Sequence, residues 1–279
     1  MKVPATSTQS INFMKPFLKW AGNKYKIVDK IKALLPPGER LVEPFVGSGA
    51  LFLNTDYPRY LLTDANEDLI ILYQHLQREG EAFIEYCRPL FTPEYNDKDR
   101  YYALRDEFNS SNDPRRKSAI FLYMNKHGYN GLCRYNMKGG FNVPFGRYKR
   151  PYFPEAEMRH FAQQAQRATF QHSNFVVTMA NCQPGDVVYC DPPYVPLSET
   201  ANFTSYSADG FGWAEQQELA RQATKLAQRG IPVIISNHDT EEVREVYEAA
   251  EIETFEVRRF ISCNGDKREN AAELLALFS

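Results

Sequence analysis

The chain has 279 residues, of which 43% are hydrophobic and 24% charged, and its net charge is −2. These values are typical of a globular protein with one large domain, or a core domain with an insertion, and they argue against extensive disorder. No apolar run approaches the length of a membrane span, which argues against a membrane protein.

The cysteines and the first residues indicate the cellular compartment. The five cysteines are odd in number and widely spaced, with no CxxC pair, which argues against a disulfide framework and against a zinc site. The first thirteen residues are polar and lack the apolar core of a signal peptide. We therefore expect a loose leader, a cytoplasmic location, and neither a membrane nor a metal partner.

The basic residues are concentrated in one segment. Between Arg115 and Arg150 there are nine Lys or Arg and no Asp or Glu, so the remainder carries 24 basic against 35 acidic residues. Seven aromatic residues are interleaved with these charges. Rings stack on bases and cations pair with phosphates, so the segment indicates a nucleic-acid partner, with a solvated surface face as the alternative.

The first elements in chain order predict a nucleotide-binding unit. An amphipathic helix is expected over 27–35, followed by a strand over 40–45 and by the glycine turn Gly47-Ser48-Gly49. The third glycine of the dinucleotide fingerprint is replaced by Phe52, which disfavours a pyrophosphate-binding loop. A second strand over 60–63 ends at Asp64, which either binds ribose hydroxyls or caps the next helix.

The middle of the chain interrupts this alternation of strands and helices. Helices are expected at about 69–90, 99–109 and 114–126, followed by a Gly/Asn-rich basic loop over 128–154. This stretch is too long to be a crossover connection in a compact sheet. We therefore predict one domain over 1–68 and 155–279, and a second domain inserted into it over 69–154.

The final part resumes the α/β pattern. Strands are expected over 186–190 and 233–236, and helices over 213–229 and 240–250, the second capped by Asp239 or Thr240. Two last apolar runs, 254–261 and 272–278, predict a closing hairpin that turns around Asn264-Gly265 and 266–269.

Asp191-Pro192-Pro193-Tyr194 directly follows the strand over 186–190. The two prolines remove two backbone donors, leaving carbonyl oxygens beside a carboxylate and a ring, which suits a flat group with an amino function. An ordinary proline-rich turn is the alternative. In open α/β sheets, ligands bind at the carboxyl ends of the strands, so this motif, the glycine turn and Asp64 are expected to share one crevice. The combination indicates group transfer to a nucleobase.

Taken together, these stretches resemble the Dam-type DNA adenine methyltransferases. The matching segments are 17–24, 42–50, 62–69, 125–136, 142–152, 190–194 and 236–239, in the order of the family. The resemblance implies an α/β fold: a Rossmann-like, mostly parallel methyltransferase sheet of seven strands with a closing hairpin and an inserted helical DNA-recognition domain. It also implies S-adenosylmethionine as the cofactor, and contacts to it from Trp20, Lys24, Gly47, Gly49, Asp64 and Asp191.

The resemblance also implies a mechanism and a target. The target adenine is flipped out of the duplex, Asp191 and the Pro192 carbonyl accept its amino hydrogens, Pro193 completes the motif, and Tyr194 stacks on the ring. The methyl group then passes directly in line, without a covalent enzyme intermediate. The implied site is GATC, contacted through Lys19, Tyr129, Asn130, Leu132, Arg134, Pro144 and Arg147. Arg134 resembles a guanine reader and Arg147 a phosphate contact, whereas Tyr129 and Leu132 could instead be core residues and Lys19 a solvated charge.

Three departures from the family pattern are visible, and three other functions stay open. Asn23 replaces a glycine, Lys126-His127 replaces an Arg-Tyr pair, and the leader is longer while the end at Ser279 lacks a basic tail. The alternatives are a cytosine-N4 DNA methyltransferase, a DNA-binding relative without catalysis, and a nicotinamide-dependent dehydrogenase. We expect the protein to act as a monomer on double-stranded DNA.

Overall fold

The structure of the chain is a computed structural model that describes residues 13–194, 211–258 and 270–279. It contains one seven-stranded sheet with the strand order β3-β2-β1-β4-β5-β7-β6. All pairings are parallel except those of β7, which runs antiparallel to both β5 and β6. The strands are β1 (Arg40–Glu43), β2 (Arg59–Asp64), β3 (Ala168–His172), β4 (Asp186–Cys190), β5 (Val233–His238), β6 (Glu251–Arg258) and β7 (Asn270–Phe278).

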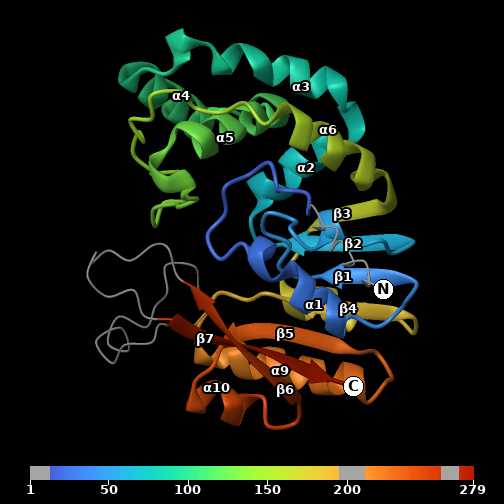
Figure 1. The fold of residues 1–279 in the computed structure, drawn as a ribbon. Coiled ribbons are helices and arrows are strands. Elements are labelled where there is room, and N and C mark those ends of the chain that lie inside the picture. Colours follow the sequence, from blue (N-terminus) through green and yellow to red (C-terminus); the bar gives the residue numbers. More distant parts are fainter. Residues whose placement is uncertain (1–12, 195–210, 259–269) are drawn as a thin grey trace, which may run out of the picture.

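Helices lie on both faces of this sheet and beyond one edge. Figure 1 shows α3, α4, α5 and α6 gathered beyond the β3 edge, with α9 and α10 at the opposite end, near β5 and β6. The α-helices in the described residues are α1 (Val28–Leu34), α2 (Glu67–Glu79), α3 (Glu81–Cys87), α4 (Lys98–Ser110), α5 (Pro114–His127), α6 (Glu155–Gln164), α7 (Phe175–Ala180), α9 (Trp213–Ala227) and α10 (Glu241–Val246).

Local sequence signals explain where several helices begin. The side chains of Asn66, Asp97 and Asp113 accept hydrogen bonds from the first backbone amides of α2, α4 and α5. Thr240 caps α10 in the same way, as one of the two expected caps. Such capping typically contributes about 1 kcal/mol to helix stability.

The residues of each strand alternate between two hydrophobic layers. On β4, Val187 and Tyr189 belong to the layer under the helical region, whereas Val188 and Cys190 face α7 and α9. The first layer continues without interruption into α2, α4 and α5, through buried residues such as Tyr73 and Phe121. The helical region therefore shares its core with the sheet.

The sheet agrees with the expected fold class, but several element boundaries differ. β3 is an additional strand, and α6 and α7 are additional helices. The helix expected at 69–90 is divided by Gly80, which has a φ of 52° and lies between α2 and α3. The helix expected at 240–250 ends at Val246, and the strand expected over 40–45 ends at Glu43. The antiparallel pair β6 and β7 agrees with the predicted hairpin, whose expected turn at 264–269 lies outside the described residues.

Candidate active site and DNA interface

The glycine turn follows β1 and lies beside the carboxyl end of β2. Gly47 and Gly49 have positive φ values of 47° and 70°, which glycine adopts without strain. The Gly47 amide donates to Asp64 Oδ2 at 3.0 Å, and the Asn66 amide donates to Asp64 Oδ1 at 2.9 Å. Asp64 is therefore tied to the glycine turn, and Asn66 rather than Asp64 is the cap of α2.

The segment before η1 (Lys24–Ile27) covers this turn from the other side. The indole of Trp20 lies so close to Gly47 that a Cβ there would be 3.0 Å from its Cδ1 and Nε1 atoms. Asn23, which stands where the family pattern has glycine, has a φ of −49° and accepts a hydrogen bond from the Tyr25 amide. Asparagine therefore fits this position without backbone strain.

Lys24 is buried and engages the motif at the end of β4. Its ammonium group lies 2.9 Å from Asp191 Oδ1 and donates to the Gly22 carbonyl at 2.8 Å. Desolvation lowers the pKa of Lys24, but the attraction of Asp191 and neighbouring groups exceeds this effect, and the net pKa is raised. In this structure Lys24 therefore stays charged and holds the Asp191 carboxylate.

The two prolines after Asp191 differ in how their carbonyl groups are used. The buried side chain of Gln216 on α9 donates to the Pro193 carbonyl at 3.0 Å, which fixes the loop and occupies one of the two lone pairs of that oxygen. Among the described residues no hydrogen bond reaches the Pro192 carbonyl. The Pro193 carbonyl therefore already has one partner within the protein, whereas the Pro192 carbonyl has none in the described structure.

Tyr194 lies beside the same lysine. The Lys24 ammonium is 4.4 Å from the centre of the Tyr194 ring, and His238 contacts that ring edge-on with the centroids 4.4 Å apart. The Tyr194 hydroxyl donates to Glu273 at 3.5 Å, and burial raises its pKa well above the ordinary value. A base that stacks on the face covered by Lys24 requires this lysine to move.

Glu43 is a site residue that the sequence interpretation did not single out. It ends β1, is only 2% exposed, and its Oε1 atom has no hydrogen-bond partner within the described structure. Burial and the nearby Asp191 raise its pKa to about 8. An acid closing the first strand directly before the glycine turn is the signal that could have identified it.

These groups form one set of acceptors at the carboxyl ends of β1, β2 and β4. The orphaned Oε1 of Glu43 can take a cationic group, because a buried acid without a donor is stabilised by a positive charge. Asp64 keeps acceptor capacity beyond its two amide donors, which suits hydroxyl groups. A nucleoside that carries an amino acid cation fits these two ends of the site.

The seven residues expected to contact DNA are all exposed, and several meet at one place. The Lys19 ammonium lies 4.2 Å from the centre of the Tyr148 ring, and the Tyr148 hydroxyl accepts a hydrogen bond from the Asn130 amide. The Tyr129 amide donates to the Pro144 carbonyl, which joins the two halves of the loop. Tyr129 and Leu132 are 52% and 37% exposed, so the alternative that they belong to the core is wrong.

Arg134 and Arg147 lie in the same loop region. The Arg134 guanidinium donates to the side chain and the carbonyl of Asn142, which holds it extended at the surface. Arg147 has a φ of 53°, and Asn130 has the same value, both uncommon for residues other than glycine. Such backbone strain is frequently found at binding sites.

The nine basic residues do not act as one charged patch. Arg115, Arg116 and Lys117 at the start of α5 form ion pairs with Glu79, Glu107 and Asp68. The remaining exposed cations lie in the loop after α5, and these are Arg134, Lys138, Arg147, Lys149 and Arg150. The charge available to a polyanion is therefore smaller than the sequence suggested, and it is concentrated at the loop.

Lys126 and His127 are buried at the end of α5. Lys126 is 7% exposed, and desolvation and the nearby Lys19 lower its pKa to about 8. His127 is 1% exposed and stacks on Tyr123 at a centroid distance of 4.0 Å, and burial lowers its pKa to about 4. His127 is therefore an uncharged core residue near pH 7.

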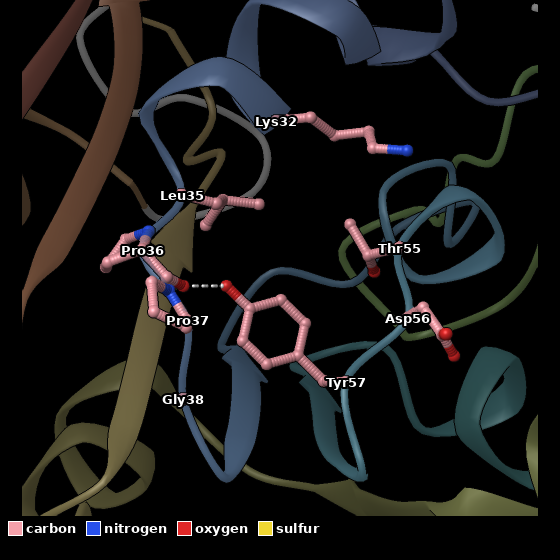
Figure 2. A pocket seen from close by; sticks show the side chains of 8 residues that line it. All are labelled: Lys32, Leu35, Pro36, Pro37, Gly38, Thr55, Asp56 and Tyr57. Carbon is pink, nitrogen blue, oxygen red and sulfur yellow. Dashed lines mark hydrogen bonds between the residues drawn. The ribbon is translucent and has the colours of Figure 1, made fainter.

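A separate surface cavity of about 280 Å³ lies away from these groups, near the amino end of β1 (Figure 2). The Tyr57 hydroxyl donates to the Pro36 carbonyl across it at 2.6 Å. The lining residues are Lys32, Leu35, Pro36, Pro37, Gly38, Thr55, Asp56 and Tyr57. It lies before the amino ends of β1 and β2, whereas open α/β sheets bind their ligands at the carboxyl ends of the strands.

The described part of the chain contains neither a metal-binding cluster nor a membrane-spanning helix. No group of three or more His, Cys, Asp or Glu residues there is arranged to hold a metal ion. None of the helices described is both long and apolar enough to cross a membrane. The four described cysteines, Cys87, Cys133, Cys182 and Cys190, are free thiols.

Comparisons with known proteins agree with one another. The profile of the D12 class N6 adenine-specific DNA methyltransferases matches residues 20–261. The chain is 54% identical to DNA adenine methylases of Salmonella typhi and Escherichia coli (strain K12) over 264 residues, which is 95% of this chain and 95% of each relative. It is 53% identical to a DNA adenine methylase of Vibrio cholerae over 266 residues, covering 95% of this chain and 96% of the relative.

Proposed function

Because the chain belongs to the D12 class of N6 adenine-specific DNA methyltransferases, we propose that it methylates the adenine of double-stranded GATC. Family membership makes it an S-adenosylmethionine-dependent DNA adenine methyltransferase with a Rossmann-like fold. The sequence target, the base flipping and the residue functions below are the proposal. The observation that supports it is the position of Asp191 directly after β4, near Glu43 at the end of β1 and at the same ends of the strands as Asp64.

The proposed chemistry begins with the amino group of adenine. This nitrogen is a weak nucleophile because its lone pair is delocalised into the ring. The Asp191 carboxylate and the Pro192 carbonyl would accept its two hydrogens, which increases the electron density on nitrogen. Pro193 supports this geometry through the hydrogen bond from Gln216. No covalent enzyme intermediate is required, and the buried Cys190 thiol, whose pKa burial raises, is not needed as a nucleophile.

The target base has to leave the duplex before these groups can reach it. The amino group of adenine is involved in base pairing, so base flipping precedes the reaction. Tyr194 would stack on the flipped ring, with Lys24 moving away from the face it covers here. Tyr129 and Asn130, both exposed on the loop after α5, would occupy the space that the base leaves.

The cofactor would lie along the crevice and supply the methyl group when bound. Trp20 and the turn of Gly47 and Gly49 would form its walls, and Asp64 would accept its ribose hydroxyls. Glu43 would accept its ammonium group, because that cation relieves the cost of ionising a buried acid. Before the base enters, Lys24 would hold the Asp191 carboxylate through their ion pair.

The loop after α5 would provide sequence recognition. Arg134 would read guanine through two hydrogen bonds, which typically gives about 1–3 kcal/mol of discrimination. Leu132 and Pro144 would contact the neighbouring base pair, Lys19 the outer pair and Arg147 a phosphate. We accordingly propose that 69–154 is the DNA-recognition region and that 1–68 with 155–279 is the catalytic region. The enzyme would act as a cytoplasmic monomer on DNA.

The test is to incubate the protein with labelled S-adenosylmethionine and duplexes that differ only in the presence of GATC. We expect label in N6-methyladenine of the GATC duplex and little in the other. Label in cytosine would support the cytosine-N4 alternative, and label in neither duplex despite DNA binding would support a catalytically inactive relative. Equal label in both duplexes would contradict GATC recognition while leaving adenine methylation intact.

A further inference from the structure

Two buried hydroxyl groups lie behind Asp191. The Tyr189 hydroxyl donates to Ser236 Oγ at 3.1 Å, and Ser236 Oγ donates to Asp191 Oδ1 at 3.0 Å. Tyr189 is 3% exposed and Ser236 is 0% exposed. Bulk water therefore does not compete for these hydrogen bonds, and they are stronger than at a surface.

The strand register produces this arrangement. β4 and β5 pair in parallel with Cys190 opposite Ile235, so Asp191 continues level with Ser236. Side chains two positions apart on a strand share a face, which puts Tyr189 and Asp191 on the same face of β4. Tyr189 and Ile234 belong to the same hydrophobic layer, as this alternation requires. Ser236 therefore lies where it can meet both.

The number of available protons determines the direction of the two hydrogen bonds. A serine hydroxyl has one proton to donate and can accept others. Because Ser236 accepts from Tyr189, its own proton is available to Asp191 at 3.0 Å, which is closer than the Cys190 carbonyl at 3.4 Å.

The two donors to the Asp191 side chain converge on the same oxygen. Ser236 Oγ and Lys24 Nζ both meet Oδ1, at 3.0 and 2.9 Å. Within the described residues, every hydrogen bond and ion pair of this carboxylate involves Oδ1. The terminal torsion of an aspartate is broad, so the carboxylate would rotate if it had no fixed partner. Oδ2 is thereby left in a defined position for a substrate.

We propose that Ser236, supported by Tyr189, is a positioning residue that fixes Asp191 so that Oδ2 accepts the amino hydrogen of the target adenine. This inference rests on the proposed adenine-N6 transfer. Lys24 contributes charge to the same oxygen, but it also covers Tyr194 and is expected to move when the base enters. The hydrogen bonds from Tyr189 to Ser236 and from Ser236 to Asp191 are the contacts that remain in place throughout the reaction.

The test measures single-turnover methyl transfer at saturating cofactor and GATC duplex, together with both dissociation constants and the melting temperature. Ser236→Ala should lower the rate constant about tenfold to a hundredfold, the range expected for a small misplacement of a reacting group. Tyr189→Phe should lower it about twofold to tenfold, the range of one net hydrogen bond. Both dissociation constants should stay close to those of the wild type.

Two further variants separate positioning from a general loss of structure. Ser236→Thr keeps the hydroxyl group and should restore most of the rate. Thr178→Val removes another buried hydroxyl, one that contacts Thr63 rather than Asp191, and should leave the rate unchanged. Because Tyr189 acts through Ser236, the double variant Tyr189→Phe/Ser236→Ala should be no slower than Ser236→Ala.

The possible failures can be told apart. A Ser236→Ala protein with the wild-type rate constant overturns the inference, and so does a loss matched by Thr178→Val or by weaker binding. A double variant much slower than Ser236→Ala overturns the contribution of Tyr189 through Ser236. Failure of the proposed function looks different: the wild type would transfer no methyl group to adenine, or Asp191→Ala would keep full transfer.

Discussion

Replacing Glu43 by glutamine should stabilise the protein and weaken its cofactor binding. The Glu43 carboxyl group is fully buried, and its pKa is raised from 4.5 to about 8. An acid whose pKa is raised in the folded protein stabilises the fold fully below pH 4.5. This stabilisation is lost as the pH rises toward 8, because the carboxyl group ionises at a lower pH in the unfolded chain than in the folded protein. Between pH 4.5 and 7 the free energy of unfolding falls by about 1.4 kcal/mol per pH unit, so the buried Glu43 carboxyl group costs about 3 kcal/mol of stability at pH 7.

Glutamine keeps the shape of the side chain and an acceptor oxygen but has no proton to lose. Because a buried amide has its own desolvation cost, we expect a gain of about 1–3 kcal/mol at pH 7, or an increase of about 3–8 °C in melting temperature. The exposed Glu39→Gln is the matched control and should change stability by less than about 0.5 kcal/mol. The assay is denaturant or thermal unfolding of both variants and the wild type between pH 5 and 8.

The same substitution should affect the cofactor in the opposite direction. Since Glu43 is largely protonated at pH 7, binding of a cationic ligand beside it should release about one proton. Calorimetry of S-adenosylmethionine binding in buffers of different ionisation enthalpy measures this release. In Glu43→Gln the proton release should disappear, and the affinity for the cofactor should fall about tenfold. The reasoning is refuted if Glu43→Gln is no more stable than Glu39→Gln, or if its proton release equals that of the wild type.

Two more predictions concern the DNA interface, and a third concerns a buried lysine. Arg134→Ala should reduce the preference for GATC over GATC-free duplexes by about 1–3 kcal/mol in competition binding, whereas Arg150→Ala in the same loop should not alter that preference. Arg147→Ala should weaken binding to all duplexes and lower the salt slope by about 0.9, because one phosphate is no longer neutralised; weaker binding confined to GATC duplexes would show that Arg147 reads bases. The pKa of Lys126 is lowered to about 8. The neutral side chain therefore stabilises the fold fully above pH 10.5, and this stabilisation is lost as the pH falls through 8. Lys126→Met should therefore raise the unfolding free energy by about 1–3 kcal/mol at pH 7 and by little above pH 10.5, and an equal gain at both pH values would contradict this cause.

The central strands could be predicted from the sequence because burial on both faces requires continuous apolar runs. β4 is the best example, since all of its residues, Asp186–Cys190, are buried. β3 was missed because three of its five residues, Thr169, Gln171 and His172, are exposed at the edge of the sheet. An edge strand with this composition has no strong apolar signal.

The residues of the site were identifiable where a motif is local, as in Asp191–Tyr194 and the glycine turn. The contacts that hold these residues in position could not be predicted from the sequence. Lys24 and Asp191 are far apart in the chain, and so are Asp191 and Ser236, so their pairing depends on the fold. The same is true of Arg115, whose ion pair with Glu79 removes one cation from the DNA-binding charge.

The most direct test of the account compares methyl transfer by the wild type, Asp191→Ala and Asp106→Ala under single-turnover conditions on a GATC duplex. Asp106 is an exposed residue of α4 and serves as the control. The account predicts transfer to adenine N6 at equal rates for the wild type and Asp106→Ala, and a loss of at least about a hundredfold in Asp191→Ala. Full transfer by a folded Asp191→Ala protein would contradict it.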